Sequence, residues 1–246
     1  MQNYCFFYER FFLRFTIICF IIFFILSCSS KKVTLIHHEE PEFVPTDTIS
    51  NYFLFDYIKS LSEDDYYIKL DSIKNRLSSD FFALRMAYTH TDNYSPYGID
   101  ESDSLKKASE LIDSSKFDSA ILVLNRVYDT NFVSIPAHLY LGYIYNQLGD
   151  SVQSNFHYYI YNGLLNSIYQ SGDGQSPETA YIVISTKEEY NFLSWFNLHV
   201  NSQSLVAKDA YSFDLMKVTD KNSGGKFEIY FNIELAFSLL RDTFSK

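Results

Sequence analysis

Two short segments of the chain carry residue types that could do chemistry. The first is the loop Gly172-Asp173-Gly174, because glycines around a carboxylate can cradle a phosphate or a metal ion. The second is the adjacent pair Glu188-Glu189, because paired carboxylates can act as general acid and base. Together with a histidine they define a hypothetical hydrolytic site whose candidate residues are Asp173, Glu189 and His138.

Structural interpretations of the same residues are stronger. No lysine follows the glycine loop, and its spacing matches neither a phosphate loop nor a calcium loop, so it is typical of a turn that ends a helix. Ser185 and Glu188 have the spacing of a capping box. His138 and His157 could meet across a helical hairpin, but no metalloprotease or serine hydrolase motif accompanies them. The sequence therefore predicts neither a metal site nor a cofactor and favours a protein that is not an enzyme.

A second group of residues indicates recognition. Tyrosines are frequent between residues 140 and 161, where they cover several faces of two expected helices. A tyrosine combines apolar area with a hydroxyl group, which suits a binding surface. A coding bias toward aromatic residues is the alternative explanation for their number. The candidates for a binding surface are Tyr140, Tyr143, Tyr158 and Tyr161.

The composition limits the partners. The 246 residues include 20 Lys and Arg against 30 Asp and Glu, which gives a net charge of −10. Non-specific binding to nucleic acid depends on neutralising phosphates with basic side chains, so the chain is not expected to bind nucleic acid. The hydrophobic fraction of 47% is sufficient for a buried core.

The N-terminus predicts a lipoprotein. Arg10 and Arg14 precede the apolar run 15–26, which has the length of a signal-peptide core and is shorter than a membrane span. Ser27-Cys28 follows it and resembles a bacterial lipobox, which implies cleavage after Ser27 and a lipid on Cys28. The serine after Cys28 resembles an outer-membrane sorting signal, which places the protein in the bacterial cell envelope, facing the periplasm. An uncleaved anchor or a coincidental cysteine is the alternative.

The rest of the chain is expected to form one α+β domain behind a tether. Residues 1–27 are the signal peptide, 28–50 the lipidated N-terminus and flexible tether, 51–170 a helical region, and 171–246 an α+β region of the same domain. Cleavage and lipidation leave the mature chain without a free thiol, which excludes disulfides and cysteine chemistry.

The helical region has a repeat. Leu141-Gly142, Tyr145 and Gly149 follow the spacing of a tetratricopeptide helix-turn-helix, and a shift of 34 residues upstream places Ala108 on Gly142 and Ser115 on Gly149. Small residues at these positions would let paired helices approach closely. An ordinary pair of helical hairpins is the alternative, since repeat arrays usually need at least three units.

The C-terminal region alternates between apolar and polar residues. Residues 180–184 predict a short strand, and 185–196 predict a helix. Residues 211–215 and 227–233 flank the turn 222–225 and predict an antiparallel hairpin. The fold class is therefore α+β, with helical hairpins, a short strand, a helix and a C-terminal hairpin in that order.

Several ordered motifs resemble an uncharacterised bacterial family, domain of unknown function 4919. The resemblance spans about residues 51–240 and rests on Leu84-Arg85-x-Ala87-Tyr88, Tyr94-x-Pro96-Tyr97-Gly98, Ala137-His138-Leu139, Gly163-Leu164-Leu165-x-x-Ile168, Gly172-Asp173-Gly174 with Thr179-Ala180-Tyr181, Glu188-Glu189-Tyr190, Gln203-Ser204-Leu205 and Tyr230-Phe231-Asn232. It implies no activity, substrate or cofactor.

The expected function is therefore binding without catalysis. We expect a lipoprotein held at the membrane by Cys28, whose domain binds a protein or peptide partner or acts as a scaffold. The alternative is an envelope hydrolase that uses the region from Gly172 to Glu189.

Overall fold

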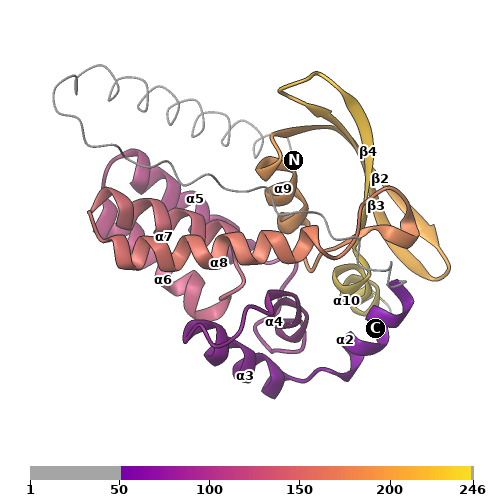
Figure 1. The fold of residues 1–246 in the computed structure, drawn as a ribbon, viewed down its shortest axis with the longest axis horizontal. Coiled ribbons are helices and arrows are strands. Elements are labelled where there is room, and N and C mark those ends of the chain that lie inside the picture. Colours follow the sequence, from indigo (N-terminus) through magenta and orange to yellow (C-terminus); the bar gives the residue numbers. More distant parts are fainter. Residues whose placement is uncertain (1–50, 245–246) are drawn as a thin grey trace. The chain divides into compact units, whose positions relative to one another are not determined.

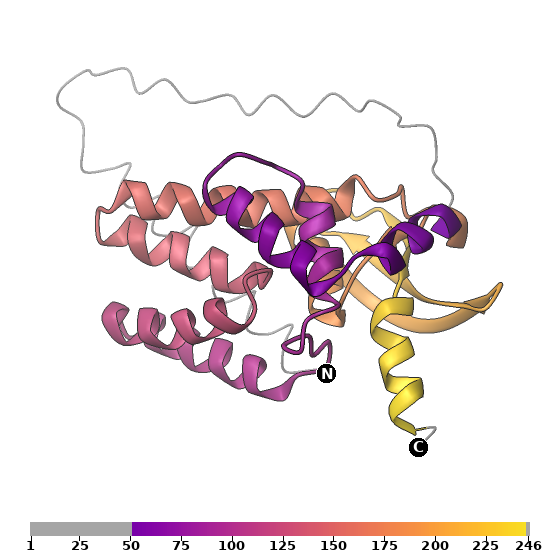
Figure 2. The same ribbon diagram turned by 90° about the horizontal axis from the view of Figure 1, so that it is seen from below.

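The described part of the chain, residues 51–244 of a computed structural model, starts with helices, continues into a sheet and ends with one further helix (Figures 1 and 2). It lies within one compact unit, Pro45–Lys246. The predicted signal peptide, Cys28 and the tether lie outside the described residues. The helical elements that precede the sheet are α2 (Asn51–Ser60), α3 (Glu63–Lys74), α4 (Phe81–Tyr88), α5 (Ile99–Asp113), α6 (Phe117–Thr130), α7 (Ile135–Gln147) and α8 (Ser151–Tyr169).

Short polar side chains decide where the first helices begin. Ser62 and Asp65 form a capping box that starts α3 and separates it from α2. Asp80 accepts a hydrogen bond from the backbone N–H of Ala83 and starts α4. The side chain of Asp80 therefore fixes the first residue of α4.

Helices α5 to α8 form two consecutive antiparallel hairpins. Ser115 and Gly149, 34 residues apart, both end the first helix of a hairpin with positive φ, 55° and 78°. A Cβ on Gly142 would lie 3.0 Å from the Tyr158 ring, which shows how closely α7 and α8 approach. Both hairpins therefore turn at the two positions that the 34-residue spacing indicated.

The sheet has four strands in the order β1-β4-β3-β2. The strands are β1 (Tyr181–Ile182), β2 (Leu198–Lys208), β3 (Tyr211–Asp220) and β4 (Lys226–Asn232). The predicted hairpin is β3–β4, β2 pairs antiparallel with β3, and β1 pairs parallel with β4. The α+β prediction is confirmed. The sequence analysis did not predict β2 as a strand, because most of its side chains are exposed on both faces and no alternation results.

Two further helices pack beside the sheet. Helix α9 (Thr186–Trp195) follows β1, and α10 (Glu234–Phe244) follows β4 and contacts β3. In Figure 1, α9 lies between the helical hairpins and the strands. Phe192 of α9 contacts the rings of Tyr181 and Phe231, with centroid distances of 4.6 and 5.9 Å. Through this contact α9 is fixed on the sheet.

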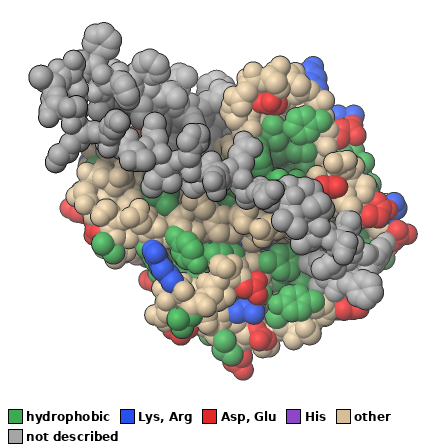
Figure 3. Space-filling model, in the orientation of Figure 1, with side chains coloured by type: hydrophobic (Ala, Val, Ile, Leu, Met, Phe, Trp, Pro, Cys, Tyr) green, Lys and Arg blue, Asp and Glu red, His purple; other side chains and the backbone are tan. Residues whose placement is uncertain are grey.

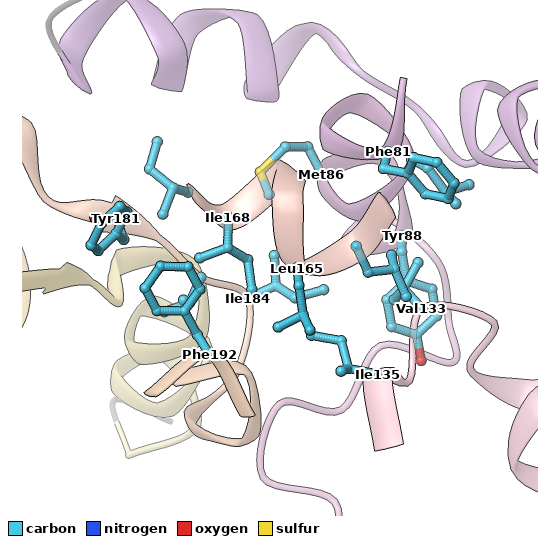
Figure 4. Packing of buried hydrophobic residues seen from close by; sticks show 14 of the residues in the cluster. Phe81, Met86, Tyr88, Val133, Ile135, Leu165, Ile168, Tyr181, Ile184 and Phe192 are labelled. Carbon is cyan, nitrogen blue, oxygen red and sulfur yellow. The ribbon is translucent and has the colours of Figure 1, made fainter. Parts of the chain in front are cut away.

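One hydrophobic cluster joins helices and sheet. Figure 4 shows α4, α8, β1 and α9 contributing to the same cluster, in which Met86, Leu165, Ile168 and Ile182 have no exposed surface. Because the helical and sheet regions share this core, side chains from both can meet in buried sites.

Candidate functional site

Glu188, the first of the two adjacent glutamates, forms a buried ion pair with Arg85 of α4. The guanidinium donates through Nε and Nη2 to the two carboxylate oxygens, at 2.8 and 2.5 Å. Both side chains are nearly inaccessible, with exposed fractions of 0 and 5%. Glu188 also accepts a hydrogen bond from the backbone N–H of Ile184. Its charge is therefore fully compensated.

Arg85 connects four elements. Besides Glu188 of α9, it donates to the Ser167 hydroxyl of α8 and to the backbone carbonyl of Ile182 in β1, at 3.2 and 2.9 Å.

The predicted capping box of Ser185 and Glu188 is only partly correct. The Ser185 hydroxyl does accept from the backbone N–H of Glu188 and caps α9, but the Glu188 carboxylate points to Arg85. The pair therefore holds the structure together and offers no free acid.

Glu189, the second glutamate, is completely buried next to Asp214 of β3. Neither carboxylate oxygen of Glu189 has a hydrogen-bond partner of the kind an ionised carboxylate needs. Burial raises the pKa of Glu189 well above its ordinary value, and the negative charges of Asp214 and Glu188 raise it further. The contact with Asp214 is stable when Glu189 holds a proton and donates it to the Asp214 carboxylate.

Three side chains from different segments surround the pair of Glu189 and Asp214, which we call the carboxyl pair. Gln203 of β2 donates its amide to Asp214 at 2.5 Å and accepts a hydrogen bond from the Tyr190 hydroxyl at 2.9 Å. Burial raises the pKa of Tyr97 in the α4–α5 loop, and the negative charges of Asp214 and Glu189 raise it further, so Tyr97 lies within electrostatic range of the two carboxyls. Tyr97 and Tyr190 are 44 and 38% exposed. The carboxyl pair thus lies below a polar and aromatic rim that solvent can reach.

The glycine loop has a structural explanation. Asp173 accepts a hydrogen bond from the backbone N–H of Gln175 in a local turn, and its side chain is exposed. The backbone N–H groups of Asp173 and Gly174 both donate to the carbonyl of Thr179. A Cβ on Gly172 would lie 2.4 Å from that carbonyl oxygen, so only glycine fits. Asp173 is fixed in a turn and faces no other candidate.

His138 lies in a separate cluster within the helical hairpins. Its Nε2 is 2.7 Å from the carbonyl of Phe132 and its Nδ1 is 3.0 Å from Nδ1 of His157. Since a carbonyl only accepts, Nε2 carries the proton and His157 donates to Nδ1. The two histidines meet as predicted, and burial lowers the pKa of His138 to about 3 and that of His157 to about 4. Asp173, Glu189 and His138 are therefore not brought together by the fold.

The predicted tyrosine surface is smaller than expected. Tyr140 is only 7% exposed, so this residue belongs to the core and cannot line a surface. Tyr143, Tyr158 and Tyr161 are half-buried, and burial raises the pKa of Tyr161 to about 12. The sequence alone did not separate them because tyrosine occurs on both buried and exposed helix faces.

A small pocket lies where the α4–α5 loop, α7 and α9 meet. Glu101 in its lining accepts hydrogen bonds from Asn131, Ser134 and Lys187. Its charged groups are therefore already paired. Among residues 51–244, no group of three or more His, Cys, Asp or Glu side chains is arranged to hold a metal ion.

Comparison with known proteins identifies the family. A family model described as Domain of unknown function (DUF4919) matches residues 49–240. The chain belongs to this family. No curated protein and no solved structure matches the chain.

Four of the segments in which the sequence resembles DUF4919 contribute side chains near the start of α9. Arg85, Tyr97, Glu189 with its two neighbours, and Gln203 all lie in such segments, and their side chains form the ion pair and the rim described above. Asp214 lies outside the motifs and was not among the candidates predicted from the sequence. Its only signal was a carboxylate within the alternating strand 211–215.

Within the described DUF4919 domain, no helix combines the length and apolar character needed to cross a membrane.

Proposed function

We propose that this DUF4919 protein is a cell-envelope lipoprotein that binds a protein or peptide partner along the edge strand β2 and does not catalyse a reaction. The observation that carries the proposal is β2 itself. This strand has 11 residues and stands at the end of the sheet, and among the described strands it pairs only with β3. A peptide can extend such a sheet by adding a strand to its edge.

Strand β2 has few of the features that protect edge strands from pairing. It contains no proline, its single lysine is Lys208 at its end, and one bulge lies between Val200 and Ser202. Leu205, near the far end of the strand, is 57% exposed. A long edge with small polar side chains and an exposed leucine is suited to backbone pairing with an extended partner.

The negative net charge of the protein favours a partner with a basic surface. The chain is acidic overall, and on the face shown in Figure 3 Lys and Arg side chains occur singly and do not form a continuous patch. A lipid on Cys28 and the tether of residues 28–50 would confine this domain to a membrane surface. Confinement raises the local concentration of a partner in the same membrane.

The edge-strand proposal is tested by site-specific photocrosslinking in intact cells with Cys28 retained. A crosslinking amino acid replaces Ser202 or Ser204 on β2, or Asp118 on α6 as the control, and all three side chains are exposed. We expect one adduct of the same mass from both β2 positions and none from position 118. Adducts from position 118 alone, or equal adducts from all three, contradict the proposal.

The lipid anchor is tested separately with Cys28→Ala. We expect this variant to accumulate as an unprocessed precursor or to leave the membrane fraction, because the thiol is the site of lipid attachment. Cell fractionation and the mass of the N-terminal peptide measure both outcomes. Processing and membrane retention identical to those of the unaltered protein would exclude the anchor without affecting the edge-strand proposal.

A further inference from the structure

We propose that the carboxyl pair, Glu189 and Asp214, is the receptor for an ammonium group, supplied by a lysine side chain of the strand that binds to β2. The inference rests on the proposed edge-strand function and specifies the chemistry of the partner. It starts from two carboxyl groups that lie in contact in the interior without a basic side chain between them.

The two carboxyls need a positive charge that the described residues do not provide. Apart from the proton that the two carboxyls share, neither oxygen of the fully buried Glu189 carboxyl receives a hydrogen bond, and the further donor to Asp214 is the neutral amide of Gln203. The Arg85 guanidinium, which pairs with the neighbouring Glu188, is already engaged by Glu188, Ser167 and the carbonyl of Ile182. A shared proton keeps the pair together in the free protein, and a cation could replace that proton.

The ligand set favours an ammonium group over a divalent metal ion. Calcium requires six to eight oxygen ligands, whereas the site offers two carboxyls and one amide. No third carboxylate completes a metal-binding group in the described residues. An ammonium group needs only about three acceptors, which the two carboxyls and the Gln203 oxygen can provide after rotation of the amide.

The rim suits the hydrophobic stem of a lysine. Tyr97 and Tyr190 are partly exposed beside the carboxyls, and tyrosine rings attract cations placed over their faces. Leu205 is paired directly opposite Asp214, so both side chains lie on the same face of the sheet. The aliphatic stem can lie along Leu205 while the charged end reaches the carboxyls.

The position of β2 explains why the side chain must be long. A strand added outside β2 lies two strand spacings from β3, about 10 Å from the Asp214 backbone. Among aliphatic amines in proteins, lysine has the longest stem. The partner is therefore an extended segment with a lysine that faces the same side of the sheet as Asp214 and Leu205.

The proposal is tested with short synthetic peptides of alternating threonine and valine. One peptide has a central lysine, a second has norleucine at that position, and a third has the shorter diaminobutyric acid. Isothermal titration of the full mature domain should show the lysine peptide binding at least about tenfold more tightly than either of the others. In Asp214→Asn and in Glu189→Gln this preference should fall to about twofold or less.

A matched control separates the carboxyl pair from general charge. Glu178 carries an exposed carboxylate that pairs with Lys208 at the end of β2, so Glu178→Gln removes a nearby negative charge outside the site. This variant should keep the full lysine preference. An equal loss in Glu178→Gln would overturn the inference, and the use of both Asp214→Asn and Glu189→Gln guards against one of them failing to fold.

The outcomes also distinguish this inference from the proposed function. Equal binding of all three peptides would overturn the lysine receptor and leave edge-strand binding intact. No binding of any peptide, together with no photocrosslink at positions 202 and 204, would contradict both proposals. A lysine preference that survives both carboxyl substitutions would place the charge recognition elsewhere and overturn the inference.

Discussion

Replacing Arg85 by methionine is expected to lower the free energy of unfolding by about 3–5 kcal/mol. Methionine fills much of the volume, but it leaves the Glu188 carboxylate buried without its cation and two further acceptors without a donor. Urea unfolding followed by circular dichroism measures the loss. The helical content of the remaining folded protein should change little, since α4 is capped by Asp80 and not by Arg85.

Two further variants show whether Arg85→Met loses stability because the ion pair of Arg85 and Glu188 is buried. Lys217 and Glu228 form an exposed pair on β3 and β4, with side chains 57 and 49% exposed, so Lys217→Met should cost no more than about 1 kcal/mol. The double variant Arg85→Met, Glu188→Leu removes both charges and should recover part of the loss. If Arg85→Met is no more destabilising than Lys217→Met, the buried pair does not have the role we assign to it.

Acid is expected to destabilise the protein through His138 and His157. Both have an ordinary pKa of 6.5, which burial lowers in the folded state to about 3 and about 4. Below pH 6.5 the unfolded chain binds protons that the folded chain does not, so the stability is full above that pH and falls as the pH decreases toward 4. In the pH range where both histidines contribute, the free energy of unfolding changes by up to about 2.7 kcal/mol per pH unit.

The contribution of the histidines is isolated by substitution. His138→Gln should reduce the slope between pH 6 and pH 4.5 by about 1.4 kcal/mol per pH unit, because one buried titrating group is removed. Urea unfolding at a series of pH values measures the slope. His199→Gln, which replaces an exposed histidine of β2, is the control substitution. A His138→Gln slope equal to that of the unaltered protein would contradict a neutral, buried histidine pair.

Local signals in the sequence predicted much of the helical region. The turns at Ser115 and Gly149 act on neighbouring backbone groups, so their effects can be read from a few residues. The β3–β4 hairpin follows from the alternation on both sides of the turn 222–225. In these segments local preference and the final fold agree.

Contacts between distant residues could not be predicted in the same way. Arg85 and Glu188 are 103 positions apart, and no pattern within either segment specifies the pairing. An arginine within the apolar helix Phe81–Tyr88 was the available signal that a buried counterion must exist. Glu189 was identified as a candidate, but its partner Asp214 was not, because one carboxylate in a strand does not reveal which helix covers it.

The parallel pairing of β1 with β4 makes the order of folding asymmetric. Helical hairpins α5–α8 involve neighbours in sequence and can form as soon as residue 169 is available. Strand β1 must wait for β4, about 50 residues later, and the turn at Gly174 is completed only when the N–H of Tyr230 donates to its carbonyl. A nascent chain that ends before residue 226 would therefore have folded helical hairpins, whereas β1 and the core around it would lack the partner strand β4. The last strand to be synthesised is the one that closes the domain.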